Sequence, residues 1–381
     1  MTPSYKPSDG IQRILDTSER PSGRPGPDII SLAAGDPDFE TPAHIRQALI
    51  DAIESGYTHY IDQRGDPELR AAIADHASKL TSTPVTDPET AVTHGGAGSL
   101  ASAIMAVVNP GDRVLIPEPT YSSYADILRL IGAEPVFMTQ TPDFHLDLDR
   151  IRAEAPDARL IIICHPNNPT GVVYTRQELV ELAAIADQHD MYVLADEAYE
   201  ALVFDGVDFA STLEIPELRE RLIYCQTFSK RFAMTGWRLG YMIAPAQLTA
   251  YAAMVHRTFN GAGNAAVQRA ALAAMTTPSD APEQMRLEYQ ARREIVAELL
   301  AGAPGAEVKE PDGSFYYFVK VTAPNAPADM VAAALEQGVA IRAGTEYGPS
   351  GKGYFRITFA TDRERLNEGV RRLRRMIESW G

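Results

Sequence analysis

The chain has 381 residues, of which 45% are hydrophobic and 23% are charged, and its formal net charge is -16. This length exceeds one average domain, so we expect one large domain with a smaller companion. The acidic balance argues against a nucleic acid as the main partner, because phosphate backbones favour Lys and Arg. Ordinary solubility is enough to account for the charge.

The cysteines and the hydropathy pattern indicate a soluble enzyme of a reducing compartment. Cys164 and Cys225 lie inside apolar runs that read as strands, so we expect buried small hydrophobes rather than a disulfide framework. No run of roughly 18 apolar residues occurs, and the first residues lack the apolar core of a signal peptide. We therefore expect no contact with a membrane and, by default, a cytoplasmic location.

The first third of the chain predicts an arm followed by loops and helices. Residues up to about 30 are rich in Pro, Gly and Ser, with one short helix expected at 11–15. A turn-forming string, Ala34-Gly35-Asp36-Pro37-Asp38-Phe39, follows a short strand. Helices are expected over 44–55 and from about residue 66 onward.

From residue 91 onward, short apolar runs alternate with amphipathic helices, which is typical of a mostly parallel sheet covered on both faces. One helix opens with the capping box Thr175-Arg176-Gln177-Glu178 and is expected to end near His189. We predict an α/β domain over 45–275 whose sheet has seven strands. These strands are expected at 91–93, 113–116, 135–138, 160–164, 191–195, 222–226 and 240–243.

The remainder of the chain predicts a second, smaller unit. After about Pro278 a long, charge-rich helical pattern begins, and the strings 314–319 and 354–359 read as strands. We expect residues 276–381 to form a smaller α+β domain together with the N-terminal arm, residues 1–44.

Chemically distinctive residues follow the ends of the predicted strands. Ligands of such sheets collect at the carboxyl ends of the strands, so these residues are expected to meet. The glycine-rich segment 94–99 follows one strand and opens a helix, so its backbone N–H groups suit a phosphate. An amide, a carboxylate, a phenol and an amine follow other strands, namely Asn168, Asp196, Tyr199 and Lys230.

Lys230 decides which chemistry this set favours. A lysine amine forms a Schiff base with a carbonyl only in its neutral form, so burial or nearby cations such as Arg231 and Arg238 must lower its pKa. The hydroxyls of Thr227 and Ser229 and the fork of Arg238 are phosphate ligands. A carbonyl-binding amine beside a phosphate site predicts pyridoxal 5′-phosphate (PLP) as the cofactor.

The other strand-end residues fit what this cofactor needs from a protein. Asp196 is placed to pair with the pyridine nitrogen, and Asn168 and Tyr199 are placed to hydrogen-bond the phenolic oxygen of the ring. Tyr121 is the candidate for stacking on the ring face. A cap, a turn or core packing would explain each residue alone, and it is their joint order along the chain that favours the cofactor.

Over nearly its whole length the chain resembles the class I/II, fold-type I PLP-dependent aminotransferases. The resemblance is carried by residues 34–39, Asn167-Asn168-Pro169-Thr170-Gly171, Asp196-Glu197-Ala198-Tyr199, Thr227-Phe228-Ser229-Lys230 and Tyr354-Phe355-Arg356. It implies transfer of the amino group of an L-amino acid to a 2-oxo acid.

The resemblance also implies a role for each site residue. Lys230 would form the Schiff base and carry the proton between the substrate Cα and the cofactor. Arg356 would bind the substrate α-carboxylate with help from Asn168 and the Gly35 backbone. The phosphate would be held by Gly96, Ala97, Thr227, Ser229 and Arg238. Tyr60 would reach the phosphate of a neighbouring subunit, which implies a homodimer with shared active sites.

Two departures from the family pattern lie near the residues expected to bind the substrate, and the first bears on its identity. Dicarboxylate-specific members use an arginine from the partner subunit or a lysine directly after the Gly-Gly pair, where this chain has the segment 259–264 (Phe-Asn-Gly-Ala-Gly-Asn) and Ala97. We therefore expect neutral, apolar or aromatic donors rather than aspartate, with Arg257 or Arg342 as arginines that could admit glutamate. Ala343 stands where a proline is common, without a firm consequence.

Other functions are compatible with parts of the sequence. A lyase or a β/γ-replacement enzyme on the same scaffold is the main alternative, because fold and cofactor do not fix which bond breaks. A non-catalytic PLP-binding regulator is less favoured, because no basic DNA-binding module is present. The remote alternative is an NAD-dependent oxidoreductase, since Gly96–Ala101 fits a dinucleotide fingerprint with Glu118 for the ribose, but it leaves Asp196 and Lys230 without roles. No metal site is expected.

Overall fold

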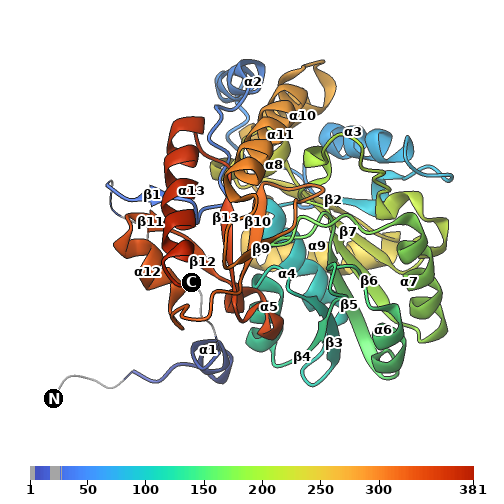
Figure 1. The fold of residues 1–381 in the computed structure, drawn as a ribbon. Helices are drawn as coiled ribbons and strands as arrows, with labels where there is room; N and C mark the ends of the chain where they lie inside the picture. Colours follow the sequence, from blue (N-terminus) through green and yellow to red (C-terminus); the bar gives the residue numbers. More distant parts are fainter. Residues whose placement is uncertain (1–4, 18–25, 27) are drawn as a thin grey trace.

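The computed structural model describes residues 5–17, 26 and 28–381 (Figure 1). Its largest element is a seven-stranded sheet in the order β2-β8-β7-β6-β5-β3-β4, in which only β8 runs antiparallel to its neighbours. All seven predicted strands are therefore confirmed, with ends shifted by at most two residues. The strands are β2 Thr90–Thr93, β3 Arg113–Glu118, β4 Glu134–Thr139, β5 Ala158–Cys164, β6 Tyr192–Asp196, β7 Leu222–Thr227 and β8 Gly240–Ile243.

Alternate side chains of the central strands enter two cores, one on each face of the sheet. In β5, Ile161 and Ile163 join one core while Leu160 and Ile162 join the other, as the period of two requires. The first core is covered by α3 Pro67–Ser78, α6 Leu148–Glu154, α7 Arg176–Gln188 and α10 Ala265–Thr276, with α2 Ala43–Glu54 packed on α10. The second is covered by α4 Gly95–Val107, α5 Ser123–Ile131 and α9 Ala246–Asn260.

The C-terminal part forms a second sheet beside the first, in red and orange in Figure 1. Its four strands are antiparallel in the order β12-β13-β10-β9, with bounds Arg342–Ala343, Tyr354–Thr358, Tyr316–Val321 and Ala306–Val308. The helices of this part are α11 Ala281–Leu300, α12 Met330–Glu336 and α13 Arg363–Glu378. The strands predicted near 314–319 and 354–359 are thus confirmed.

The N-terminal segment is attached at two places. Strand β1, Ile30–Ser31, pairs in parallel with β11, Val339–Ala340, so the chain before the large sheet joins the C-terminal part. The short helix α1, Asp9–Leu15, lies against α5, where Arg13 Nε donates a hydrogen bond to the Arg129 carbonyl at 2.7 Å. The predicted helix at 11–15 is confirmed.

Short elements complete the fold. The helix α8, Phe228–Arg231, follows β7 directly. The 3₁₀ turns are η1 Asp87–Glu89, η2 Glu200–Leu202, η3 Thr212–Glu214, η4 Pro216–Leu218, η5 Thr235–Trp237, η6 Gly344–Tyr347 and η7 Pro349–Gly351. Cys164 and Cys225 are buried and unpaired, as predicted. Within the described ranges, no helix combines the length and the apolarity that crossing a membrane requires.

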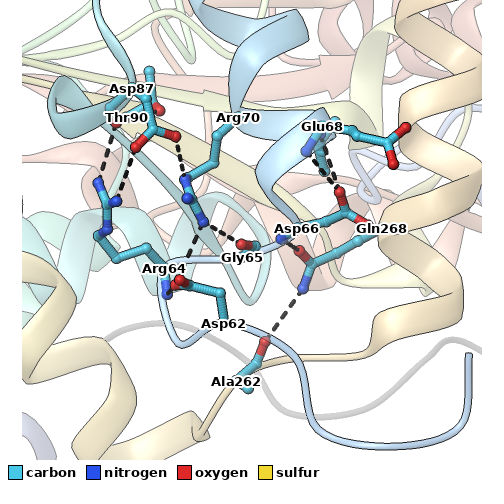
Figure 2. A network of polar contacts seen from close by, with 11 residues as sticks. Asp62, Arg64, Gly65, Asp66, Glu68, Arg70, Asp87, Thr90, Ala262 and Gln268 are labelled. Carbon is cyan, nitrogen blue, oxygen red and sulfur yellow. Dashed lines mark hydrogen bonds and ion pairs between the residues drawn. The ribbon is translucent and has the colours of Figure 1, made fainter.

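A polar network fastens the segment before α3 to the segment before α10 (Figure 2). The side chain of Gln268 makes both links: its Oε1 accepts from the Asp66 backbone N–H at 2.7 Å, and its Nε2 donates to the Ala262 carbonyl at 3.3 Å. Asp66 also caps α3 by accepting from the Glu68 N–H, and the buried Arg70 donates to the Gly65 carbonyl. Because these groups are mostly buried, the two loops are held at a fixed separation.

Candidate active site

A cavity of about 310 Å³ opens between the carboxyl ends of the large-sheet strands and the second sheet. Its volume lies within the range of about 300–1,000 Å³ that small-molecule sites occupy. Every site residue predicted from the sequence lines it except Tyr60, which is 97% exposed and lies elsewhere, and Arg257, which instead donates to Gln63 Oε1 at 3.2 Å. The lining residues among those predicted are Gly35, Gly96, Ala97, Tyr121, Asn168, Asp196, Tyr199, Thr227, Ser229, Lys230, Arg238 and Arg356.

Lys230 extends from α8 into this cavity. Its Nζ donates a hydrogen bond to the Gly35 carbonyl at 2.5 Å. Burial lowers the pKa of the amine to about 8; the charges of Arg356 and Arg238 act in the same direction, and Asp36 acts against them. Arg231, which we also expected to lower this pKa, instead donates to Glu200 at 2.9 Å. The amine is therefore neutral much more often than an exposed lysine.

The first turn of α4 forms an anion cradle. The His94 side chain at its N-cap accepts none of the free helix N–H groups, which leaves them available to a ligand. Gly95 has a φ of 73°, which favours glycine, and a Cβ there would lie 2.7 Å from Arg238 Nη2 and push this guanidinium aside. Thr227 Oγ1 and Ser229 Oγ lie 2.8 Å apart at the end of β7. Amides, hydroxyls and a guanidinium thus face one region, as a phosphate requires.

Asp196, at the end of β6, is buried with two hydrogen bonds. Its Oδ2 accepts from the Tyr124 hydroxyl at 2.7 Å, and its Oδ1 accepts from the Ala198 N–H at 3.2 Å. Burial raises the pKa of the carboxyl, and the hydrogen bond from Tyr124, the bond from Ala198 and the Lys230 charge each act to lower it. Tyr121 packs edge-to-face on Tyr124, with ring centroids 5.5 Å apart, and so belongs to the same cluster.

Tyr199 and Tyr316 form a hydroxyl pair on the side of the second sheet. Their Oη atoms lie 3.1 Å apart, and both side chains are buried. A Cβ on Gly35 would lie only 1.9 Å from Tyr316 Oη, so any larger residue there would displace the Tyr316 hydroxyl. The glycine of the 34–39 string is therefore favoured by a close approach that the sequence does not show.

Arg356, on β13, is a buried cation with neutral partners. Its Nη1 donates to Asn168 Oδ1 at 3.0 Å and its Nη2 donates to the Ala33 carbonyl at 2.6 Å. The guanidinium lies 4.0 Å from the ring centre of Tyr316 and 5.0 Å from that of Tyr347. Among the described residues its buried Nε has no hydrogen-bond partner. A buried charge in this state is suited to receive an anion.

Sequence reasoning missed several residues that line the cavity, and it missed Tyr124, which contacts the cavity residue Asp196. Tyr124 and Tyr316 sit in apolar patterns that indicate core packing, and their polar role could be found only from the rule that a buried tyrosine hydroxyl needs a partner. Glu346 and Tyr347 lie on η6, in a loop without a periodic signal. The further missed lining residues include Ala33, Asp36, Leu100, Cys164, Ala198 and Thr235.

Glu118 does not have the role that a dinucleotide site would give it. Its Oε2 accepts from both the backbone N–H and the hydroxyl of Ser350, at 3.0 and 2.5 Å, and its Oε1 accepts from Thr139 Oγ1 at 3.2 Å. The carboxylate is buried and holds the loop at η7 in place. It is therefore committed to the fold and not available to a ribose.

Comparisons with known proteins agree with this geometry. The family model described as "Aminotransferase class I and II" matches residues 27–373. A protein of Pyrococcus horikoshii named aspartate aminotransferase is 34% identical over 92% of this chain and 91% of its own length. Aromatic-amino-acid aminotransferase 2 of Thermococcus litoralis is 35% identical over 97% of this chain and 95% of its own.

Solved structures give the same result. The aromatic aminotransferase of Pyrococcus horikoshii OT3 superimposes with a TM-score of 0.90 and 33% identity, covering 97% of this chain and 99% of that one. The aspartate aminotransferase of Thermus thermophilus with maleate gives a TM-score of 0.86 and 32% identity, covering 97% of both chains.

Proposed function

The chain belongs to the class I and II aminotransferases and is an aminotransferase, and from that premise we propose that it works with pyridoxal phosphate bound to Lys230 in the cavity described above. The predicted fold, type I, is confirmed by the solved relatives. When bound, this cofactor supplies an aldehyde that takes up the amino group and a protonated ring that accepts the electron pair released at Cα.

We propose that Lys230 both attaches the cofactor and moves the proton at the substrate Cα. With a pKa of about 8, roughly a tenth of the amine is neutral at pH 7, against less than ~0.1% for an ordinary lysine. Its position beside the Gly35 carbonyl and above the Phe315 ring, 5.5 Å from the ring centre, keeps the amine inside the cavity. A neutral amine is the form that can attack a carbonyl and accept a proton.

Asp196 is proposed to hold the proton on the ring nitrogen. Burial favours the neutral carboxylic acid, but the Tyr124 and Ala198 hydrogen bonds favour the carboxylate that this role needs. Asn168 and Tyr199 are proposed to hydrogen-bond the phenolic oxygen, and Tyr121 to cover the ring face. All four line the same cavity as Lys230, which supports the assignment.

The phosphate is proposed to bind at the first turn of α4. Gly96 and Ala97 supply backbone N–H groups there, and Thr227, Ser229 and Arg238 supply two hydroxyls and one guanidinium. The fit is supported by Gly95, where any side chain would meet Arg238.

Arg356 is proposed to bind the α-carboxylate of the substrate, beside Asn168 and Gly35. Its fork suits the two oxygens of a carboxylate, and its present partners are neutral oxygens. Ala97 brings no cation to the cavity. Because burying an unpaired carboxylate costs several kcal/mol, we propose that neutral apolar or aromatic donors are preferred over aspartate.

A homodimer with shared sites is also proposed. Tyr60 is 97% exposed and Phe259 is 69% exposed, although both are large and partly apolar. A partner subunit that covers this part of the surface would bury both side chains. In this arrangement Tyr60 would reach the phosphate of the neighbouring subunit, since it does not line the cavity of its own chain.

Two broader assignments are also proposed. The division into a large domain, 45–275, and a smaller one, formed by 1–44 and 276–381, is supported by the two separate sheets and by α11, which leads from one to the other. A reducing, cytoplasmic location is supported by the two buried, unpaired cysteines.

The alternatives are less well supported. The relatives reported above are named aminotransferases, which favours transamination over elimination or replacement on the same scaffold. The chain belongs to the aminotransferase family, and Glu118 accepts a hydrogen bond from Ser350. Both findings argue against an NAD-dependent oxidoreductase.

The observation that carries the proposal is the meeting of Lys230, Asp196 and Arg356 in one cavity. The test is borohydride reduction of the PLP-loaded protein followed by peptide mapping, with Lys309→Ala as the matched control, because Lys309 also donates to a backbone carbonyl but is exposed. We expect the label on Lys230 and its loss in Lys230→Ala alone. Labelling of a different lysine would refute the assignment.

A second measurement tests the substrate class. Single-turnover rates are compared for aspartate, leucine, methionine, phenylalanine and alanine, monitored by conversion of the cofactor to its amine form. We expect faster conversion with the neutral donors. A clear preference for aspartate would show that a cation of the cavity is available to the second carboxylate.

A further inference from the structure

Arg342 is an arginine of the cavity that lies beside Arg356. The two residues are direct cross-strand partners in the antiparallel pair of β12 and β13. Side chains paired in this way leave the same face of the sheet about 5 Å apart, and both line the cavity. The like charges of two such neighbouring arginines repel each other unless an anion compensates them.

Glu346 is an anion in position to compensate Arg342. Its Oε2 lies 3.4 Å from Arg342 Nη1, and the side chain is 5% exposed. This distance is longer than that of a charge-assisted hydrogen bond, which is typically about 2.7–2.9 Å. Arg342 Nε is buried and has no hydrogen-bond partner among the described residues. Arg342 is therefore paired in charge but keeps donors that a better-placed carboxylate could use.

The other cations of the cavity already have roles under the proposed function. Among the described residues that line it, the remaining lysine and arginine side chains are Lys230, Arg238 and Arg356, which attach the cofactor, bind its phosphate and bind the α-carboxylate. Arg342 is the cation left for a carboxylate on the substrate side chain. Its availability depends on Glu346.

We propose that Arg342 and Glu346 together set the side-chain charge that the enzyme accepts. Glu346 masks Arg342, so a dicarboxylate substrate must displace Glu346 before its second carboxylate can pair with the arginine. A neutral side chain needs no such displacement. The inference rests on the proposed function, because it requires the α-carboxylate to occupy Arg356.

The surroundings of Glu346 allow the displacement. Glu346 lies on the short turn η6, between β12 and β13, so a rotation of its side chain does not require either strand to move. Together with Tyr121 and Tyr347 it also lines a second cavity of about 240 Å³ next to the first. A carboxylate that leaves Arg342 therefore has space to enter on the far side of Glu346.

The test removes the masking charge with an isosteric change. Glu346→Gln, Arg342→Gln and the double variant are loaded with PLP, and the binding of succinate and of 4-methylpentanoate is measured by calorimetry. We expect Glu346→Gln to bind succinate about 10- to 100-fold more tightly, the effect of one charge-assisted hydrogen bond. Binding of 4-methylpentanoate is expected to stay unchanged, and the double variant to lose the gain. Single-turnover rates with aspartate and leucine are expected to follow the same order.

Glu307→Gln is the matched control. Glu307 pairs with Lys320 at 2.8 Å on the same sheet, but both side chains are largely exposed, so the variant removes an equal charge away from the cavity. We expect no gain in succinate binding. Thermal melts of every variant show which of them fold, and Glu346→Ala replaces Glu346→Gln if the latter does not.

Several outcomes would overturn the inference. One is unchanged succinate binding in a folded Glu346→Gln protein, and another is a gain that persists when Arg342 is also replaced. A loss of turnover with lysine or arginine as donor, without a gain for succinate, would instead make Glu346 a receptor for basic side chains. A wild-type protein that binds neither PLP nor 4-methylpentanoate would refute the proposed function itself.

Discussion

Replacing Lys230 is expected to stabilise the protein in the absence of cofactor while abolishing its activity. The pKa of Lys230 is lowered from the usual 10.5 to about 8, chiefly by burial, and this difference is worth about 3 kcal/mol of folding free energy at neutral pH. Lys230→Met removes that cost but leaves the Gly35 carbonyl without its donor, which costs about 1 kcal/mol. We therefore expect a net gain of about 2 kcal/mol at pH 7.

The sign of the pH dependence follows from the lowered pKa. Between about pH 8 and 10.5, the unfolded wild-type chain holds a proton on this amine that the folded chain has lost, so wild-type stability rises with pH in that window. The advantage of Lys230→Met is thus complete below about pH 8 and disappears as the pH approaches 10.5.

Urea denaturation of the cofactor-free proteins at pH 7 and pH 10 measures the difference. Lys309→Met is the control, because Lys309 Nζ also donates to a carbonyl, that of Asp143 at 2.6 Å, but from an exposed position. We expect Lys309→Met to show no gain. A Lys230→Met protein that is less stable than wild type at pH 7, or whose advantage does not change with pH, would refute the reasoning.

Three further predictions concern the assembled site. Tyr124→Phe removes the 2.7 Å hydrogen bond to Asp196 and so raises the pKa of that carboxyl; we expect the acidic limb of the kcat profile to move up by about 1–2 pH units, with PLP still bound. Arg356→Lys keeps the charge but loses the fork, so KM is expected to rise about 10- to 100-fold for every amino-acid donor, measured by steady-state kinetics; a rise for one donor only would contradict it. Mixing Tyr60→Phe subunits with Lys230→Ala subunits is expected to give hybrids with one normal site, and sedimentation that shows a fully active monomer would exclude the shared site.

The strands and the meeting of the strand-end residues were predictable from the sequence for a physical reason. Central parallel strands are buried on both faces, so they appear as continuous apolar runs such as 160–164. Parallel strands also end at the same edge, so order along the chain places Asn168, Asp196 and Lys230 together. The glycine-rich segment could likewise be placed, because it lies between a strand and a helix.

The remaining features depend on contacts between residues far apart in the chain. Tyr124 reaches Asp196 from a helix whose pattern indicates only packing, and Tyr316 approaches Gly35 from the second sheet. Tertiary geometry likewise decides that Arg231 donates to Glu200 instead of lying close to Lys230. No local pattern encodes such distances, and the proposed contact of Tyr60 with another subunit would involve a second chain.

The polar network at Gln268 limits how the substrate range of such an enzyme can change. One amide side chain holds both the segment that follows Tyr60 and the loop at residues 261–264. Substitutions that reshape this loop for a new substrate would therefore also displace the segment that carries Tyr60, and with it the proposed contact to the neighbouring phosphate. Changes of specificity made inside the cavity, at Arg342 or Glu346, carry no such penalty. This asymmetry favours changes of specificity in the second sheet, while the loop between α9 and α10 would be constrained by the proposed contact of Tyr60 with the phosphate.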